Sequence, residues 1–112
     1  MKASIHQALA RLPAAETKIY PKGAPFVSMM AGGTMSVEVF APKEADLQQP
    51  HPQDELYFIH SGTAQIIINE QRFDAAPGDA FFVAAGVMHK FENFSSDFVT
   101  WVVFYGPQGG EQ

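Results

Sequence analysis

Hydrophobic and polar residues alternate in short runs along most of the chain, from Tyr20 onward. Runs that are rich in β-branched and aromatic residues are typical of strands with one buried face. Six such runs are Val37–Phe40, Leu56–Ile59, Ala64–Ile68, Ala80–Ala84, His89–Phe94 and Phe98–Tyr105. Turn-forming residues separate them, at Ser61-Gly62, Asn69-Glu70, Pro77-Gly78, Gly86 and Gly106-Pro107. Pro77-Gly78 suits the two central positions of a type II turn. Many short strands without helices between them predict an antiparallel sandwich or barrel.

One helix is predicted, near the N-terminus, over about residues 4–15. Apolar residues recur there at i, i+4 and i+7, starting from Ile5. Ser4 can cap the first turn, and Pro13 ends the pattern. A short amphipathic helix needs an apolar surface to cover, and the outer face of a sheet is the simplest one. We therefore expect the helix to pack outside a barrel that spans about residues 20–106.

Length and composition fit a single domain over residues 1–112. The chain is 46% hydrophobic and contains ten Phe, which favours a globular fold over disorder. Its net charge of −5 comes without a basic patch, so nucleic acid is not an expected partner. The chain has no Cys, so any metal ion must be held by nitrogen and oxygen donors.

The sequence gives no sign of a membrane partner or of export. Its apolar runs fall short of the roughly 20 residues that a membrane-spanning helix needs. His6, Gln7 and Arg11 interrupt the segment that would have to form the core of a signal peptide. We expect a cytoplasmic protein.

Polar residues at the ends of two predicted strands suggest a metal site. Gln49, His51 and Glu55 are spaced by two and four residues, and in an extended chain such side chains point to one face. Two prolines flank His51 and stiffen this segment. His89 opens a strand far downstream. If the barrel brings His51, Glu55 and His89 together, they form a two-histidine, one-carboxylate set that suits Fe(II), and also Zn, Mn or Ni.

Each of these residues also has a simpler interpretation. Alone, His51 reads as a surface histidine between prolines. Asp54 competes with Glu55 as the carboxylate, although Glu55 has the same parity as His51. His60 has the opposite parity and should point away from the site, so we interpret it, like His6, as structural.

Two aromatic residues are candidates for a substrate pocket. Tyr57 shares a face with Glu55, and Phe91 shares one with His89. The Tyr57 hydroxyl is equally consistent with a hydrogen bond to a substrate and with a satisfied position in the core. Phe91 is at least as consistent with plain core packing.

The two polar segments resemble the two sequence motifs of the cupin family. The first motif, G(x)5HxH(x)3,4E(x)6G, is followed by Gln49-x-His51-x3-Glu55-x6-Gly62. The second, G(x)5PxG(x)2H(x)3N, is followed at Gly78, Gly86, His89 and Asn93. The resemblance implies an all-β double-stranded β-helix, the cupin jelly-roll barrel, with the short helix outside it. It also implies one divalent metal ion (Fe, Mn, Ni or Zn) on His51, Glu55 and His89.

Three positions depart from the family pattern. Lys43 replaces the first glycine and Ala84 replaces the proline, and both positions have structural roles. Gln49 replaces the first histidine, which puts the fourth ligand in doubt. An amide oxygen suits hard metals better than soft ones, so Gln49 is either a weak fourth ligand or a donor behind the ligands.

Two functions of different classes are consistent with these residues. The first is a metal-dependent enzyme, such as an oxygenase or isomerase, that acts on a small organic molecule. The second is a non-catalytic cupin that binds a small ligand, for example as a sensor, and Gln49 favours it. We further expect a homodimer in which a second copy covers the apolar strands Val37–Phe40 and Val99–Tyr105.

Overall fold

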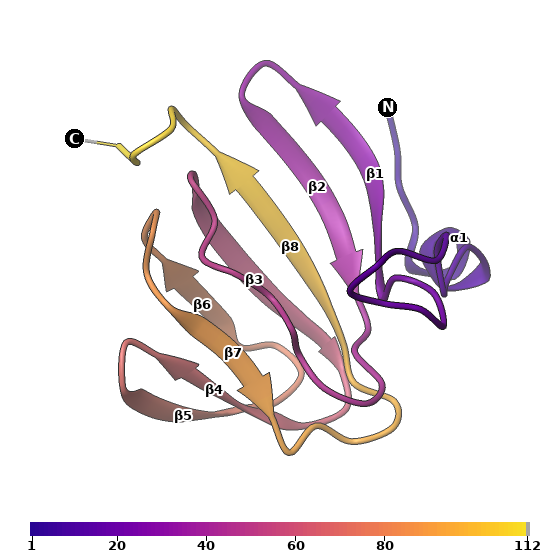
Figure 1. The fold of residues 1–112 in the computed structure, drawn as a ribbon. Helices are drawn as coiled ribbons and strands as arrows, with labels where there is room; N and C mark the ends of the chain where they lie inside the picture. Colours follow the sequence, from indigo (N-terminus) through magenta and orange to yellow (C-terminus); the bar gives the residue numbers. More distant parts are fainter. Residues whose placement is uncertain (112) are drawn as a thin grey trace.

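The computed structural model describes residues 1–111, which form two antiparallel sheets that face each other and one short helix at the side (Figure 1). The elements are α1 (Ile5–Ala10), β1 (Phe26–Gly32), β2 (Met35–Phe40), β3 (Asp54–Ser61), β4 (Ala64–Ile68), β5 (Gln71–Ala75), β6 (Ala80–Val83), β7 (His89–Glu92) and β8 (Val99–Tyr105). The larger sheet has the order β1-β2-β8-β3-β6, and the smaller one has the order β5-β4-β7. The predicted all-β jelly-roll barrel with a short N-terminal helix is confirmed.

All six predicted strands are present, and two further strands were not predicted. In β1, a shift in register between Ser28 and Met30 breaks the alternation of buried and exposed positions. In β5, four of the five residues are exposed, and only Phe73 and Ala75 on one face are apolar, which is too short a pattern to predict a strand. Asn69 and Glu70 join β4 to β5 with φ of 46° and 75°, as a two-residue hairpin turn requires.

The predicted type II turn at Pro77-Gly78 is confirmed. The Asp79 amide donates to the Ala76 carbonyl at 3.0 Å, and Gly78 has φ of 94°. Gly62, at the end of the first motif, has φ of 73°, and a Cβ atom there would lie 2.6 Å from the backbone of Phe98. The glycine is therefore required where the chain leaves β3 against the start of β8.

The helix is shorter than predicted, because it ends at Ala10 and not near residue 15. Ser4 caps it as expected, accepting a hydrogen bond from the Gln7 amide at 3.2 Å. The early end follows from Pro13, which disfavours helical geometry at the residue before it. Six residues cannot cross a membrane, and no helix within residues 1–111 is long and apolar enough to do so.

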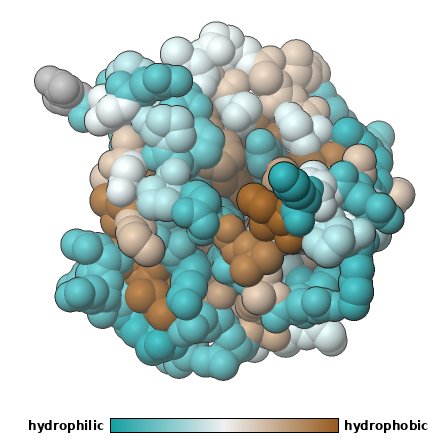
Figure 2. Space-filling model, in the orientation of Figure 1, coloured by the Kyte–Doolittle hydropathy of each residue, from teal (hydrophilic) through white to brown (hydrophobic). Residues whose placement is uncertain are grey.

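Two apolar clusters lie on opposite faces of the larger sheet. The cluster between the sheets contains Phe40, Tyr57, Phe91 and Phe98. The outer cluster lies under α1, which confirms that the helix covers the outside of a sheet. On the face seen in Figure 2, apolar side chains occupy the hollowed middle and polar side chains surround them.

The sheet order corrects one part of the dimer prediction. The strands predicted to need a second copy as a cover, Val37–Phe40 and Val99–Tyr105, lie in β2 and β8. These strands pair with each other, and β8 also pairs with β3, so neither is an edge. The edges of the larger sheet are β1 and β6. The position of an edge depends on the pairing of distant segments, which strand periodicity does not reveal.

Candidate metal centre

Glu55 and His89 meet in the interior between the two sheets. Glu55 lies on β3 in the inward-facing series with Tyr57 and Ile59, and His89 is the first residue of β7. The Glu55 Oε1 atom lies 3.0 Å from His89 Nε2, and each side chain is 1% exposed. His89 Nδ1 donates a hydrogen bond to the Val87 carbonyl at 2.9 Å, which turns Nε2 toward the carboxylate.

This pair leaves two buried polar atoms without hydrogen-bond partners, Glu55 Oε2 and His89 Nε2. An unpaired buried polar atom costs about 1–3 kcal/mol. With the proton on Nδ1, the neutral His89 ring presents a lone pair to a carboxylate oxygen, and these two groups repel unless a positive charge joins them. Burial lowers the pKa of His89, but the hydrogen bond that a protonated Nε2 would donate to Glu55, and the charge of Glu55, outweigh burial and leave the pKa raised.

A divalent metal ion fits these two side chains as well as a proton does. Imidazole nitrogen and carboxylate oxygen bind first-row metals at about 2.1 Å. Two such ligands at a right angle around one ion lie about 3.0 Å apart, by the same bond lengths. The separation of Glu55 Oε1 and His89 Nε2 is 3.0 Å. The unpaired His89 Nε2 atom and its distance from Glu55 Oε1 therefore match what a bound cation requires.

His51 lies beside this pair on the segment that precedes β3. Its carbonyl accepts a hydrogen bond from the Gly86 amide at 2.8 Å, which joins the two sequence motifs. Its ring stacks on Phe104 with 3.9 Å between centroids, and Nδ1 accepts from the Gln53 amide at 3.2 Å. That bond places the ring proton on Nε2, so His51 must turn its ring or give up this contact to bind a metal.

The structure therefore brings Glu55 and His89 together and leaves His51 next to them. Over residues 1–111, no three His, Asp or Glu side chains are gathered closely enough to hold one metal ion. Burial lowers the pKa of His51, while the charge of Glu55 raises it and that of His89 lowers it.

Gln49, the position that departs from the family motif, is exposed and lines a pocket of about 290 Å³ together with His51. Its neighbour Gln48 is the glutamine that reaches the interior. Gln48 Oε1 accepts a hydrogen bond from the Tyr57 hydroxyl at 3.0 Å. Gln48 Nε2 donates to Asp46 Oδ2 at 2.8 Å.

Asp46 fastens this segment to the smaller sheet, a role that the sequence did not suggest. Its Oδ2 atom accepts from the Phe91 amide of β7 at 2.8 Å, and its Oδ1 atom accepts from the Gln48 amide at 3.0 Å. Both Asp46 and Gln48 lie in an irregular segment, where strand parity gives no guide to side-chain direction.

Asp54, the alternative to Glu55, has a different task. Its two oxygens accept hydrogen bonds from the Ala85 amide at 2.8 Å and the Glu111 amide at 3.0 Å. These bonds lower the pKa of Asp54. Asp54 therefore fixes the segment before β7 and the C-terminal segment, and Glu55 is the carboxylate that faces His89.

Tyr57 and Phe91, the proposed pocket residues, are fully buried and do not line the pocket that contains Gln49 and His51. Their rings pack edge to face with 5.0 Å between centroids. Burial, followed by the charge of Glu55, raises the pKa of Tyr57 well above its ordinary value, so the phenol keeps its proton. His6 and His60 are exposed and lie apart from the centre.

A carboxylate that the sequence did not single out also faces the pocket. Glu38 lies on β2 opposite Val102, and both residues line the pocket. Burial, and then the charge of Glu55, raises the pKa of Glu38. Strand parity with Phe40 is the signal that could have found it, because Phe40 is a core residue two positions away.

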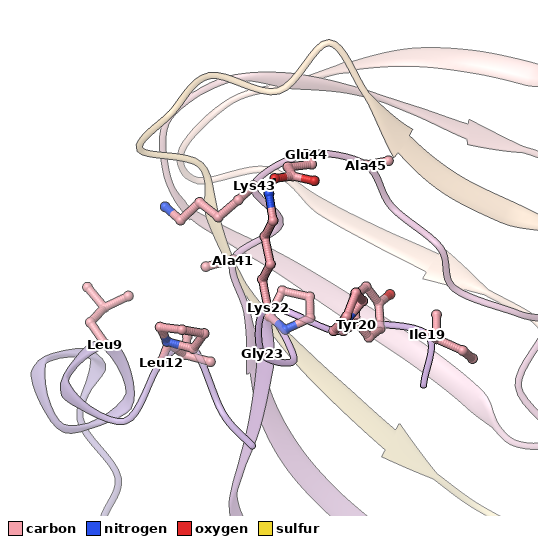
Figure 3. Close-up of a pocket in the computed structure, with 13 residues that line it drawn as sticks. Leu9, Leu12, Ile19, Tyr20, Lys22, Gly23, Ala41, Lys43, Glu44 and Ala45 are labelled. Carbon is pink, nitrogen blue, oxygen red and sulfur yellow. Dashed lines mark hydrogen bonds and ion pairs between the residues drawn. The ribbon is translucent and has the colours of Figure 1, made fainter. Parts of the chain in front are cut away.

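A second hollow of about 420 Å³ lies outside the barrel, between α1 and the segments near residues 20 and 43 (Figure 3). Lys22, Lys43 and Glu44 line it, and Lys22 pairs with Glu44 at 3.1 Å. No histidine lines this hollow. Ile19 and Tyr20 line both hollows.

Comparisons with known proteins agree with this architecture. The profile of the cupin domain matches residues 36–105. The uncharacterized protein SCO3923 of Streptomyces coelicolor is 38% identical over 85 residues, which cover 74% of this chain and 81% of that protein.

Solved structures show the same fold at low sequence identity. KdgF from Halomonas sp. superposes with a TM-score of 0.65 at 15% identity, over 74% of this chain and 78% of that one. A cupin superfamily protein from Desulfitobacterium hafniense gives 0.62 at 19%, over 73% and 76%. The DMSP lyase DddQ from Ruegeria pomeroyi gives 0.63 at 21%, over 72% of this chain but only 46% of that one. Because the profile spans more than half of the chain, from β2 to β8, the protein belongs to the cupin family.

Proposed function

We propose that this protein is a metal-binding cupin that acts as a metal-dependent enzyme on a small organic molecule. Glu55 and His89 would hold one divalent ion, His51 would join them, and Gln49 would be a weak further ligand. The observation that supports this proposal is the buried Glu55–His89 pair, in which Glu55 Oε2 and His89 Nε2 lack hydrogen-bond partners. Fe, Mn, Ni and Zn all accept imidazole and carboxylate ligands.

The chemistry of the site follows from its donors and its size. A bound divalent ion would polarise a substrate oxygen as a Lewis acid, which suits an isomerase, and iron would instead supply the activation of O₂ that an oxygenase needs. The pocket volume of about 290 Å³ limits the substrate to a small molecule. The protonated phenol of Tyr57 and its bond to Gln48 hold the segment that carries His51 in place. KdgF and a DMSP lyase share the fold, which shows that enzymes use it without indicating the reaction here.

A non-catalytic cupin that captures a small ligand is the second candidate. Two observations favour it. Gln49 stands where the family motif has a histidine, and the His51 Nδ1 atom is already engaged by the Gln53 amide. Both features weaken a metal site and leave a pocket that could still bind a ligand.

Metal analysis of protein purified without chelator tests the centre. We expect near-stoichiometric metal in the wild type, none in His89→Ala and less in His51→Ala. His60→Ala is the matched control, because His60 is an exposed histidine on β3, and it should keep the metal of the wild type. Failure of the wild type to bind Fe, Mn, Ni or Zn after loading with each would contradict the proposal.

The substitution Gln49→His tests the departure from the family motif. If Gln49 stands at a ligand position, the affinity for Zn measured by competition with a chelating dye should rise. An unchanged affinity would place Gln49 outside the ligand set.

We further propose a homodimer in the cytoplasm. Phe58 and Phe82 are 45% and 52% exposed on neighbouring strands β3 and β6 of the larger sheet. A second copy of the chain would cover these rings. Size-exclusion chromatography with light scattering should give twice the chain mass of 12.3 kDa, and a monomer at micromolar concentration would contradict the dimer. Cell fractionation tests the location.

A further inference from the structure

We propose that the pocket beside the candidate metal centre takes a small cationic molecule, an amine or quaternary ammonium compound, and that Glu38 recognises its positive charge. This inference deepens the proposed function and rests on it in one respect, because the ligand would be the substrate or effector of that same centre.

Glu38 is the charged side chain that enters this pocket from the larger sheet. It stands on β2 two residues before the core residue Phe40, and both face inward. Its strand neighbour across the sheet, Val102, is buried. No ion pair within residues 1–111 neutralises Glu38. A partly buried carboxylate without a cation beside it attracts a positively charged ligand.

The remaining lining residues favour a cation for a second reason. Tyr20, Phe26, Phe40 and Phe104 contribute aromatic side chains to the same pocket. Aromatic faces attract ammonium groups, and the attraction is stronger where water is excluded. A carboxylate together with several aromatic rings is therefore suited to an alkylated ammonium group.

Among the described residues, the pocket also lacks the cationic side chains that would bind an anion. Neither Lys nor Arg lines it, whereas Lys22 and Lys43 both line the outer hollow (Figure 3). Recognition of carboxylates and phosphates normally uses Arg or Lys. An anionic ligand would have to face Glu38 without a cationic side chain to balance the repulsion.

The charges also suggest how the ligand is oriented. Of the candidate metal ligands, His51 and Gln49 line the pocket, whereas Glu55 and His89 do not. An ion that also binds His51 would attract an oxygen atom of the ligand, whereas Glu38 attracts its cationic end. A small amino alcohol or zwitterionic ammonium compound carries both groups. The volume of about 290 Å³ lies at the lower end of the roughly 300–1,000 Å³ of small-molecule pockets, which fits such a compound.

Three probes of nearly equal shape test this inference: choline, its neutral analogue 3,3-dimethyl-1-butanol, and the anion 3,3-dimethylbutanoate. Each is titrated into the full chain at pH 7.5, first with chelator and then with Zn, and dissociation constants are measured from NMR shifts. We expect choline to bind at least about tenfold more tightly than the neutral analogue, and the anion to bind most weakly.

Variants identify Glu38 as the source of the preference. The nearly isosteric Glu38→Gln should bring choline to the affinity of the neutral analogue, whereas Glu38→Asp, which keeps the charge, should retain part of the preference. Glu70→Gln is the matched control, because Glu70 is exposed on the turn between β4 and β5, and it should behave as the wild type. The NMR spectrum of each variant shows whether it is folded.

Several outcomes would overturn the inference: equal affinity for choline and the neutral analogue, tighter binding of the anion, no binding of any probe at millimolar concentration, or an unchanged preference in Glu38→Gln. The same experiment tests the metal centre separately. Loss of the choline preference with metal still bound refutes only the role of Glu38. A preference retained in a protein that binds no metal refutes only the centre on Glu55 and His89.

Discussion

The Glu55–His89 pair should lower the stability of the metal-free protein, and replacing both residues with apolar ones should raise it. Both side chains are 1% exposed, and the atoms Glu55 Oε2 and His89 Nε2 lack hydrogen-bond partners. The double substitution Glu55→Met with His89→Leu keeps similar volumes and removes both unpaired atoms. The physical reason for this expectation is that the two unpaired buried atoms cost free energy when no metal is bound, so the pair would serve metal binding and not stability.

The magnitudes follow from the burial of the pair. Replacing a buried ion pair with packed apolar side chains of similar volume is often neutral or stabilising by about 1–4 kcal/mol. Removing one partner leaves a buried group unpaired and costs about 3–5 kcal/mol. His89→Leu should therefore be the most damaging single change, because it leaves the Glu55 carboxylate alone. Glu55→Met should cost less, about 1–3 kcal/mol, because a neutral His89 still donates to the Val87 carbonyl.

Urea unfolding in the presence of chelator, followed by the fluorescence of Trp101, the one tryptophan of the chain, measures these free energies. Addition of Zn at 100 times its dissociation constant should stabilise the wild type by about 2.7 kcal/mol and leave the double variant unchanged. If the double variant is less stable than the wild type in the presence of chelator, the pair stabilises the fold and the reasoning is refuted.

Three further predictions concern the surroundings of the centre. Gly62→Ala should lower the free energy of unfolding by about 1–2 kcal/mol because of its positive φ, and by about 1–3 kcal/mol more because the new Cβ atom meets the Phe98 backbone. Gly33→Ala, whose Cβ atom would meet nothing within 4 Å, should show only the first loss. Equal losses of the two variants in urea unfolding would contradict this prediction. Asp46→Ala should destabilise the fold by about 1.5–3 kcal/mol and weaken Zn binding by about 10–100-fold, because the segment that carries His51 loses its hydrogen bond to β7. An unchanged Zn affinity in dye competition would refute the predicted effect on binding. Burial and then Glu55 raise the pKa of Glu38, so its favourable contribution is complete below the ordinary pKa of 4.5 and is lost as pH rises through the folded pKa. Glu38→Gln should then be more stable than the wild type at pH 7 and equal to it near pH 4, and unfolding curves with the same difference at both pH values would count against this.

The parts of the molecule that follow a period of two were predictable from the sequence. Parity alone favoured Glu55 over Asp54, and the structure places Glu55 against His89 while Asp54 binds backbone amides. Strands with one buried face, such as β8, were found for the same reason. Where the backbone forms a regular strand, a single sequence is enough to predict the direction in which a side chain points.

The rest depends on how distant segments meet. β5 is exposed at four of its five positions, and the two apolar residues on one face, Phe73 and Ala75, are too few to predict a strand. Asp46 and Gln48 lie on an irregular segment, and their contacts with Phe91 and Tyr57 bridge 45 and 9 residues. The central place of β8 depends on its pairing with both β2 and β3. None of these features leaves a local pattern.

The position of the two deepest donors has a kinetic consequence. Glu55 belongs to the larger sheet and His89 to the smaller one, so a bound ion would join the sheets across the interior. With both side chains 1% exposed, exchange of such an ion needs a motion, either of the two sheets or of the pocket segment that carries His51. The rate of metal exchange would then report these motions, and substitutions far from the centre that loosen the sandwich would speed exchange without touching a ligand.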